Sequence, residues 1–302
     1  LRAAGFESYA AMTMAGSRID RIPADQFNHS VTVVKRKNGE YMLLDPTWVP
    51  FLREEWSSRE QQQNYLMGLP EGTDLMETPL SPPENHYFRI NGTSELSEDG
   101  TLTGEFTLTA EGQSDAAVRR LFTGSRRADW EGNIEKELMK ISPRIEILSV
   151  EKTHPYEYLL QPVKITVKYR IPNYAIATKE EMVFIPVVAT NLFGYSHSHT
   201  SFDPSLPARK YPFADGCSKL IEVNETITLP ASMTLAYSPE AKSVSGSGAD
   251  YESSYLLEGN VLKMHQTVRL KKRIYQPEDW TSFNQAVKYQ SEMAKQPVIL
   301  KY

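Results

Sequence analysis

Apolar and polar residues alternate along much of the chain, and this period of two predicts a protein built mainly of β-strands. The clearest case is "YFRINGTSELSEDGTLTGEFTLTAEG" at residues 87–112, where Asp99-Gly100 supplies a hairpin turn. The same pattern predicts further strands at residues 144–152, 163–171, 181–188, 220–229, 233–237, 251–258 and 261–274. "SVSGSGAD" at 243–250 is expected to be a flexible turn between two of them.

Helical spacing of apolar residues replaces this alternation in three places. Ser114 or Asp115 is the expected cap of the first helix, and Pro277 lies in the first turn of the last one. The apolar stripes of the three helices are Val118, Leu121 and Phe122; Trp130, Ile134, Leu138 and Ile141; and Trp280, Phe283, Val287 and Met293. The sequence therefore predicts an α+β fold, with a β-sandwich-like module that carries two inserted helices and a C-terminal helix.

The N-terminal part has a different organisation. "LRAAG" at residues 1–5 has the pattern of the end of an amphipathic helix that Gly5 terminates, so we expect a helical segment to precede Leu1. A strand at 6–14, a hairpin and a short helix at 59–65 follow, and Pro-rich "PLSPPEN" at 79–85 marks a boundary. We therefore divide the chain into a partial core at 1–82 and a β-rich module at 83–302, with an internal boundary near residue 210 left open.

Composition excludes some classes of function. Of the 302 residues 40% are hydrophobic and 24% charged, and the net charge of −5 gives no general attraction to nucleic acid or anionic membranes. Apolar runs such as residues 184–190 are too short to cross a bilayer. Cys217 is the one cysteine, so no disulfide can form within the chain.

The hairpin "FNHSVTVVKRKNGEYMLLDPTW" at residues 27–48 carries the candidate chemistry. If Asn38-Gly39 were a two-residue loop, His29 would lie opposite Trp48 and Asp45 would point to the other face of the sheet. A three-residue loop with Gly39 in a left-handed bulge instead places His29 opposite Thr47. Asp45 is then a diagonal neighbour roughly 7–8 Å away at Cα, within reach of the imidazole. Only the bulged turn permits the pair, and it predicts a positive φ at Gly39.

A carboxylate that binds one imidazole nitrogen fixes the tautomer and leaves the other nitrogen free to take a proton from a nucleophile. His29 and Asp45 are therefore the candidate catalytic residues. A structural His–Asp pair has the same spacing, so spacing alone leaves both interpretations open.

The order of "LRAAGFESYAAM", "FNHSVTVV" and "YMLLDPTW" resembles the second half of a bacterial transglutaminase-like core, of the papain-like superfamily. The resemblance implies a cysteine at the start of the preceding helix, whose N-terminus lowers the thiol pKa. It makes His29 the general base and Asp45 its orienting partner. "LSEDGTLTGEFTLTAEG", "RKYPF", "ITLPASM" and "DWTSFNQAVKYQ" resemble the β-rich module that follows such cores in exported bacterial proteins.

The chain departs from that pattern because no cysteine precedes His29. We expect the nucleophile upstream of Leu1, so that these residues alone are an inactive, truncated part of a cysteine peptidase or acyltransferase. Cys217 is expected to be buried, and Ser30, next to His29, must point to the opposite face of its strand.

Other candidates are weaker. His197 and His199, with Asp203 nearby, suggest a zinc or copper site, but a solvated loop is the preferred interpretation. Trp48 fits either the wall of a cleft or the core, and the amide of Asn28 is a candidate for orienting the site. No cofactor and no metal are assigned.

Two functions follow from these observations. In the first, the parent protein transfers acyl groups of peptide or amide substrates through a thiol, by hydrolysis or cross-linking. In the second, the core is vestigial and the β-rich module binds a protein or glycan partner. Neither involves nucleic acid or a transmembrane segment, and the resemblance implies an exported protein, periplasmic or at the cell surface.

Overall fold

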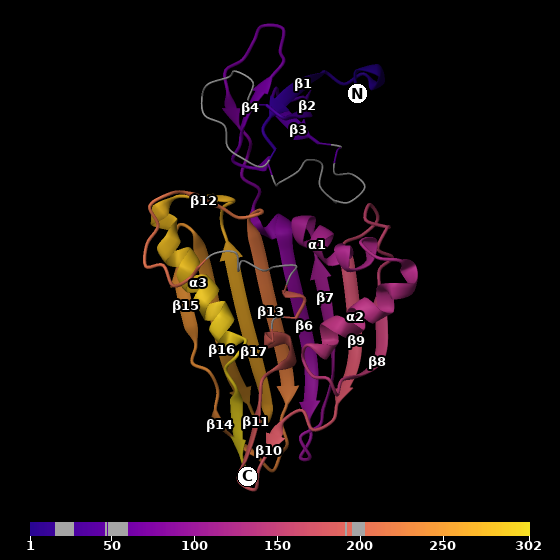
Figure 1. The fold of residues 1–302 in the computed structure, drawn as a ribbon, viewed down its shortest axis with the longest axis vertical. Helices are drawn as coiled ribbons and strands as arrows, with labels where there is room; N and C mark the ends of the chain where they lie inside the picture. Colours follow the sequence, from indigo (N-terminus) through magenta and orange to yellow (C-terminus); the bar gives the residue numbers. More distant parts are fainter. Residues whose placement is uncertain (16–26, 46, 48–59, 191, 195–202) are drawn as a thin grey trace.

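Four β-sheets form the framework of the structure, a computed structural model that describes residues 1–15, 27–45, 47, 60–190, 192–194 and 203–302. Figure 1 shows a small N-terminal sheet at one end of the molecule, above a broad sheet that three helices cross. The chain is rich in sheet and has few helices, which confirms the α+β class.

The small sheet is antiparallel throughout, with the strand order β3-β2-β1-β4-β5. Its strands are β1 (Ser8–Thr13), β2 (His29–Lys35), β3 (Tyr41–Leu44), β4 (Asn64–Met67) and β5 (Met76–Glu77). Alternate side chains form its core, and these are Ala11, Val31, Val33, Leu43, Tyr65 and Met67. A short 3-10 helix, η1 (Arg2–Ala4), precedes the sheet and ends at Gly5, whose φ of 85° confirms the predicted stop.

The short helix predicted at residues 59–65 is wrong in the part that the structure describes. Residues 64–67 form β4, which pairs with β1 through Thr13 and Tyr65. Tyr65 and Met67 are buried and Leu66 between them is not, so the local pattern has period two. Sheet pairing therefore overrides the helix propensity of the glutamines before this strand.

The large sheet has the strand order β15-β16-β17-β13-β6-β7-β9-β8. Its strands are β6 (Tyr87–Leu96), β7 (Leu102–Ala110), β8 (Glu146–Lys152), β9 (Val163–Ile171), β13 (Lys219–Thr228), β15 (Lys242–Ser245), β16 (Ala249–Glu258) and β17 (Val261–Leu270). All neighbours are antiparallel except β6 and β13, which are parallel. Strands from both sides of residue 210 thus share one sheet and one hydrophobic core. β15 occupies part of the segment predicted as a flexible turn.

Three helices cross the large sheet, α1 (Gly112–Thr123), α2 (Trp130–Met139) and α3 (Trp280–Met293) (Figure 1). The 3-10 helix η8 (Pro277–Asp279) leads into α3, and the predicted stripes are confirmed, with Val118, Ile134 and Phe283 almost inaccessible to solvent. The predicted cap of α1 is wrong: Glu111 is the N-cap, and its carboxylate accepts a hydrogen bond from the amide of Gly112. Asp115 instead binds Arg119 within the helix.

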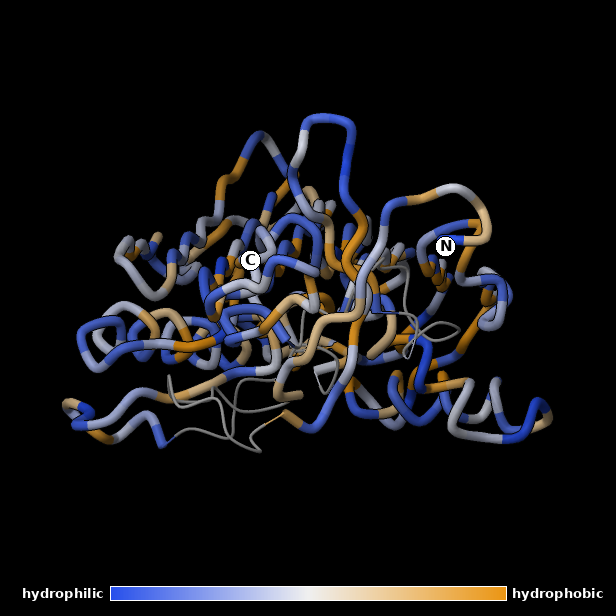
Figure 2. The backbone as a smooth tube through the Cα atoms, turned by 90° about the horizontal axis from the view of Figure 1, so that it is seen from above, coloured by the Kyte–Doolittle hydropathy of each residue, from blue (hydrophilic) through white to orange (hydrophobic). Residues whose placement is uncertain are grey.

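A four-stranded sheet of order β10-β11-β19-β14 completes the core. Its strands are β10 (Ile176–Ala177), β11 (Glu181–Phe184), β14 (Thr234–Tyr237) and β19 (Val298–Lys301). In the described residues the large sheet therefore packs with helices and this smaller sheet, and not with a second sheet of equal size as in a β-sandwich. Figure 2 shows hydrophilic segments mainly in the peripheral loops and hydrophobic ones towards the interior.

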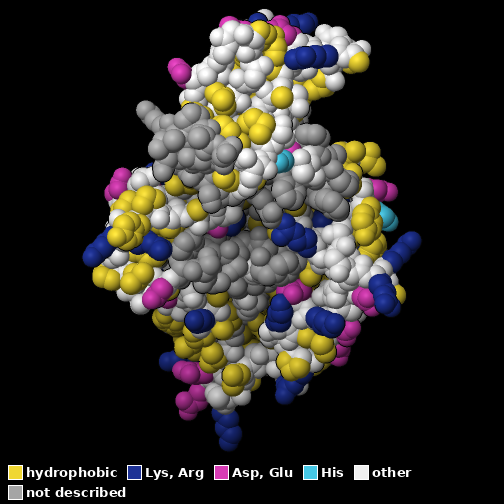
Figure 3. All heavy atoms as spheres, turned by 45° about the horizontal axis from the view of Figure 1, so that its top comes forward, with side chains coloured by type: hydrophobic (Ala, Val, Ile, Leu, Met, Phe, Trp, Pro, Cys, Tyr) yellow, Lys and Arg dark blue, Asp and Glu magenta, His cyan; other side chains and the backbone are white. Residues whose placement is uncertain are grey.

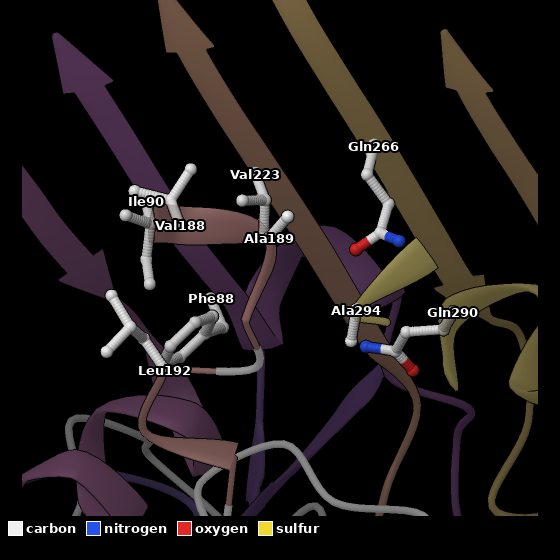
Figure 4. Close-up of a pocket in the computed structure, with 9 residues that line it drawn as sticks. All are labelled: Phe88, Ile90, Val188, Ala189, Leu192, Val223, Gln266, Gln290 and Ala294. Carbon is white, nitrogen blue, oxygen red and sulfur yellow. The ribbon is translucent and has the colours of Figure 1, made fainter. Parts of the chain in front are cut away.

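Acidic and basic side chains are interspersed on the face of the protein that Figure 3 shows. Within the described ranges, no helix has the length and apolarity needed to cross a bilayer. Phe88, Val188, Gln266 and Gln290, the last of these in α3, line a cavity with about 10 Å³ of space open to water (Figure 4). That is room for about one water molecule, so the cavity cannot hold a substrate.

Glu225 is a buried carboxylic acid in the middle of the large sheet, with 1% of its surface exposed. Ser94 Oγ donates to one carboxyl oxygen over 2.7 Å, and the Val188 amide donates to the other over 3.1 Å. Burial raises the pKa of Glu225 to about 7, although these donors oppose the shift. The side chain lies on the apolar face of β13, between Val223 and Ile227.

Gly104 of β7 is packed too tightly for any side chain. A Cβ atom there would lie 2.7 Å from the Thr93 carbonyl oxygen and 2.7 Å from the Tyr169 hydroxyl. We expect Gly104→Ala to lower the free energy of unfolding by about 2 kcal/mol, because two neighbours must move. Urea unfolding measures the change. Gly132→Ala is the matched control: it has open space in α2 and should stabilise the protein by about 1 kcal/mol.

Candidate active site

The turn between β2 and β3 has the predicted bulged form. Lys35 pairs with Tyr41 at the ends of the strands, and the Arg36 amide donates to the Glu40 carbonyl over 2.8 Å. Lys37, Asn38 and Gly39 therefore form a three-residue loop, and Gly39 has a φ of 87°. This confirms the predicted conformation of Gly39 and fixes the register of the hairpin.

His29 and Asp45 face each other across this hairpin, as the bulged turn predicts. His29 Nε2 lies 3.0 Å from Asp45 Oδ2, and the second carboxylate oxygen, Oδ1, accepts a hydrogen bond of 3.0 Å from the Thr47 amide. The Asp45 side chain is 1% exposed and that of His29 is 16% exposed. Asp45 is thus held from two sides, and the imidazole keeps one edge towards solvent.

The contact assigns a role to each ring nitrogen. A carboxylate accepts hydrogen bonds, so in the neutral ring Nε2 carries the proton and donates a hydrogen bond to Asp45. Among the described residues Nδ1 has no hydrogen-bond partner. The ring therefore presents an unprotonated nitrogen that can accept a proton.

A second carboxylate lies beside the same nitrogen and was missed from the sequence. Glu60 Oε1 is 3.6 Å from His29 Nε2, and the Glu60 side chain is 3% exposed. It precedes β4, and its backbone carbonyl accepts a hydrogen bond from Thr78 Oγ1. In the sequence Glu60 is one of several acidic residues in a polar stretch, so only the three-dimensional arrangement identifies it.

The residues after Glu60 join the small sheet to the β-rich module. Gln62 Oε1 accepts hydrogen bonds of 2.9 Å from the backbone amides of both Arg273 and Ile274. Gln61 Nε2 donates a hydrogen bond of 3.5 Å to Ser218 Oγ of the same module. Burial lowers the pKa of Arg273, and the charge of Glu60 opposes that shift. The module therefore contributes a positive charge close to the candidate site.

We expect Gln62→Ala to weaken this junction by about 2 kcal/mol, because two backbone donors lose their acceptor. Hydrogen exchange measures it directly: the Arg273 and Ile274 amides should exchange faster in the variant. Gln62→Glu, which keeps an acceptor oxygen, should leave both amides protected. If the Arg273 and Ile274 amides exchange as slowly in Gln62→Ala as in the parent, groups other than Gln62 hold the junction.

His29, Asp45 and Glu60 also have the donor atoms of a metal site. One atom from each residue can be chosen so that all three lie within 4.8 Å of one another. The set combines one imidazole with two carboxylates, which suits zinc and related divalent ions.

The other candidates from the sequence do not join this group. Ser30 is exposed on the opposite face of β2, and the side-chain amide of Asn28 binds the backbone of Ala15. Cys217 is buried, as predicted, and is not among the partners of His29. Trp48, His197 and His199 lie outside the described residues, and Asp203 accepts a hydrogen bond from the Ser205 amide.

Comparisons with known proteins support the fold more than the chemistry. Residues 181–300 match the family DUF3858, described as a domain of unknown function with a solved structure. The whole chain superimposes on 41% of the crystal structure of a "putative protease" from Parabacteroides distasonis, with a TM-score of 0.50 and 10% identity. At that identity the likeness shows a shared fold. No curated protein matches the chain.

Proposed function

We propose that His29 and Asp45 are the base and the orienting acid of a thiol-dependent acyl transferase or peptidase of the transglutaminase-like type. The observation that carries the proposal is the His29–Asp45 contact of 3.0 Å, which engages Nε2 and leaves Nδ1 available. The order of the sequence motifs and the fold shared with a protein described as a protease are consistent with it.

The chemistry needs a cysteine, and the proposal places it in the segment before Leu1. Nδ1 takes the thiol proton, and the thiolate attacks the carbonyl carbon of a peptide or amide. The tetrahedral intermediate collapses to a thioester as the imidazolium returns the proton to the leaving amine. Water or a second amine then attacks the thioester and releases the enzyme, which gives hydrolysis or cross-linking.

Asp45 contributes through the ring and not by contact with the substrate. Its carboxylate holds the Nε2–H tautomer and stabilises the positive charge that the ring gains when Nδ1 is protonated. The Thr47 amide keeps that carboxylate in place. The buried position of Asp45 strengthens the interaction because water does not screen it.

Alkylation of the protein that includes the residues before Leu1 tests the proposal, with Cys217 replaced by serine to remove its thiol. Iodoacetamide near pH 6 should label one cysteine rapidly, because a His-paired thiolate persists at a pH where ordinary thiols are protonated. His29→Gln should slow labelling by about 100-fold. If the cysteine is labelled as slowly as an ordinary, unactivated thiol, the thiol mechanism is excluded. The alternative is then a non-catalytic binding or structural protein with a vestigial core.

A further inference from the structure

Three ligand atoms meet at one point of the small sheet, from three separate segments. His29 extends from β2, Asp45 follows β3 and Glu60 precedes β4. Nε2 of His29 lies 3.0 Å from Asp45 Oδ2 and 3.6 Å from Glu60 Oε1. Two ligands bound to one zinc ion at about 2.1 Å each are typically 3–3.6 Å apart, so both distances already suit a shared ion.

Neighbouring groups hold the ligands in this arrangement. The Thr47 amide binds Asp45 Oδ1, so Oδ2 is the oxygen that faces His29. Thr78 Oγ1 binds the backbone carbonyl of Glu60, and β2 pairs with β1 at His29. Such supporting contacts are typical of metal sites, because ligands that are already oriented lose little entropy on binding.

The charge of the group favours a cation. With a neutral ring, Asp45 and Glu60 place two negative charges in a buried position, since their side chains are only 1% and 3% exposed. Arg273 interacts electrostatically with Glu60. Two carboxylates buried beside one imidazole favour a cation, because buried charges in proteins are usually paired or bound to a metal.

We propose that His29, Asp45 and Glu60 form a reversible binding site for a zinc ion. One imidazole nitrogen and two carboxylate oxygens fill three positions, and water completes a tetrahedral shell. The three side chains adjust by small movements, because their ligand atoms all lie within 4.8 Å of one another.

Zinc at this site has a chemical consequence for the ring. The metal takes the lone pair of Nε2, and the single proton of the neutral imidazole then resides on Nδ1. Nδ1 can no longer accept a proton from a thiol. Zinc therefore acts as an inhibitor of the acyl transfer, and this part of the inference rests on the proposed function.

Calorimetric titration of the metal-free 302-residue chain with zinc chloride tests the binding. His197 and His199 are replaced by glutamine in every sample, because this second histidine pair is itself a candidate ligand set. We expect one zinc ion per chain, and Asp45→Asn and Glu60→Gln should each weaken binding at least about 10-fold. His154→Gln, at an exposed histidine elsewhere, should bind as the parent does.

Cobalt(II) gives an independent readout, since a tetrahedral site with nitrogen and oxygen ligands should produce visible absorption bands that Glu60→Gln abolishes. Circular dichroism and thermal unfolding without metal verify that the variants fold. Two results overturn the site. One is zinc binding that is unchanged in both Asp45→Asn and Glu60→Gln, and the other is a parent chain that binds zinc no more tightly than about 10 μM.

The alkylation assay separates the two proposals. Rapid alkylation that zinc slows in the parent but not in Glu60→Gln supports both. Rapid alkylation without zinc binding removes the metal site and keeps the proposed function. Zinc binding to a protein whose cysteine reacts slowly keeps the metal site and removes the thiol mechanism.

Discussion

Asp45→Asn is expected to lower the rate of the proposed acyl transfer about 10³- to 10⁴-fold in a protein that carries the proposed upstream cysteine. Asparagine can still accept the hydrogen bond of the Thr47 amide through its side-chain oxygen, so the local structure should survive. Its NH₂ group then faces Nε2, which favours the tautomer with the proton on Nδ1. The ring would be correctly placed but unable to take the thiol proton.

Release of p-nitrophenol from an activated ester follows this loss without knowledge of the natural substrate. Asp203→Asn is the matched control, because Asp203 is exposed and lies outside the candidate site. An Asp45→Asn enzyme as active as its parent would reduce the His29–Asp45 pair to a structural contact. A comparable loss in Asp203→Asn would mean that the assay reports folding and not catalysis.

Glu225→Gln is expected to remove a pH dependence of stability that amounts to about 3 kcal/mol. The pKa of Glu225 is raised from 4.5 to about 7 in the folded protein, so the folded state binds the proton more tightly than the unfolded chain does. Stability is therefore highest below pH 4.5, falls as the pH rises from 4.5 to about 7, and changes no further above it on account of this group. Tyr169, Tyr174 and Tyr255 interact electrostatically with the same carboxylate and remain neutral over this range.

Urea unfolding at pH 5 and pH 8 measures the effect. The difference in unfolding free energy between the two pH values should shrink by about 2.5 kcal/mol in Glu225→Gln, because pH 5 to 8 covers most of the full effect, and the variant should be the more stable protein at pH 8. Glu222→Gln, on the same strand but partly exposed and paired with Arg89, should change stability by less than about 1 kcal/mol. An unchanged pH profile in Glu225→Gln would show that Glu225 is not the titrating group.

Local patterns predicted the elements whose stabilising contacts are close in sequence. Asn38-Gly39 and Asp99-Gly100 mark their hairpins because a left-handed glycine is needed where each turn closes, and both glycines have positive φ. The stripe of Trp280 and Phe283 identified α3, since the helix buries that face against the sheet. The His29–Asp45 contact follows from the hairpin register alone.

Features that depend on distant parts of the chain were not predicted. The parallel pairing of β6 with β13 joins strands more than a hundred residues apart, and nothing in either strand specifies it. Glu60 and Arg273 approach each other because Gln62 binds the backbone at 273–274. Glu225 was missed for a different reason: it interrupts the run Ile221, Val223 and Ile227 at a buried position, and that signal is visible in the sequence.

The position of β19 has a consequence for how the protein is made. Val298–Lys301 lies between β11 and β14 and pairs with both, although those strands are synthesised long before it. During translation β11 has one unpaired edge, and β14 has no strand partner in this sheet, until β19 has been synthesised. Exposed strand edges can pair with other chains, so a nascent protein stalled before residue 298 would be prone to aggregate or to need a chaperone.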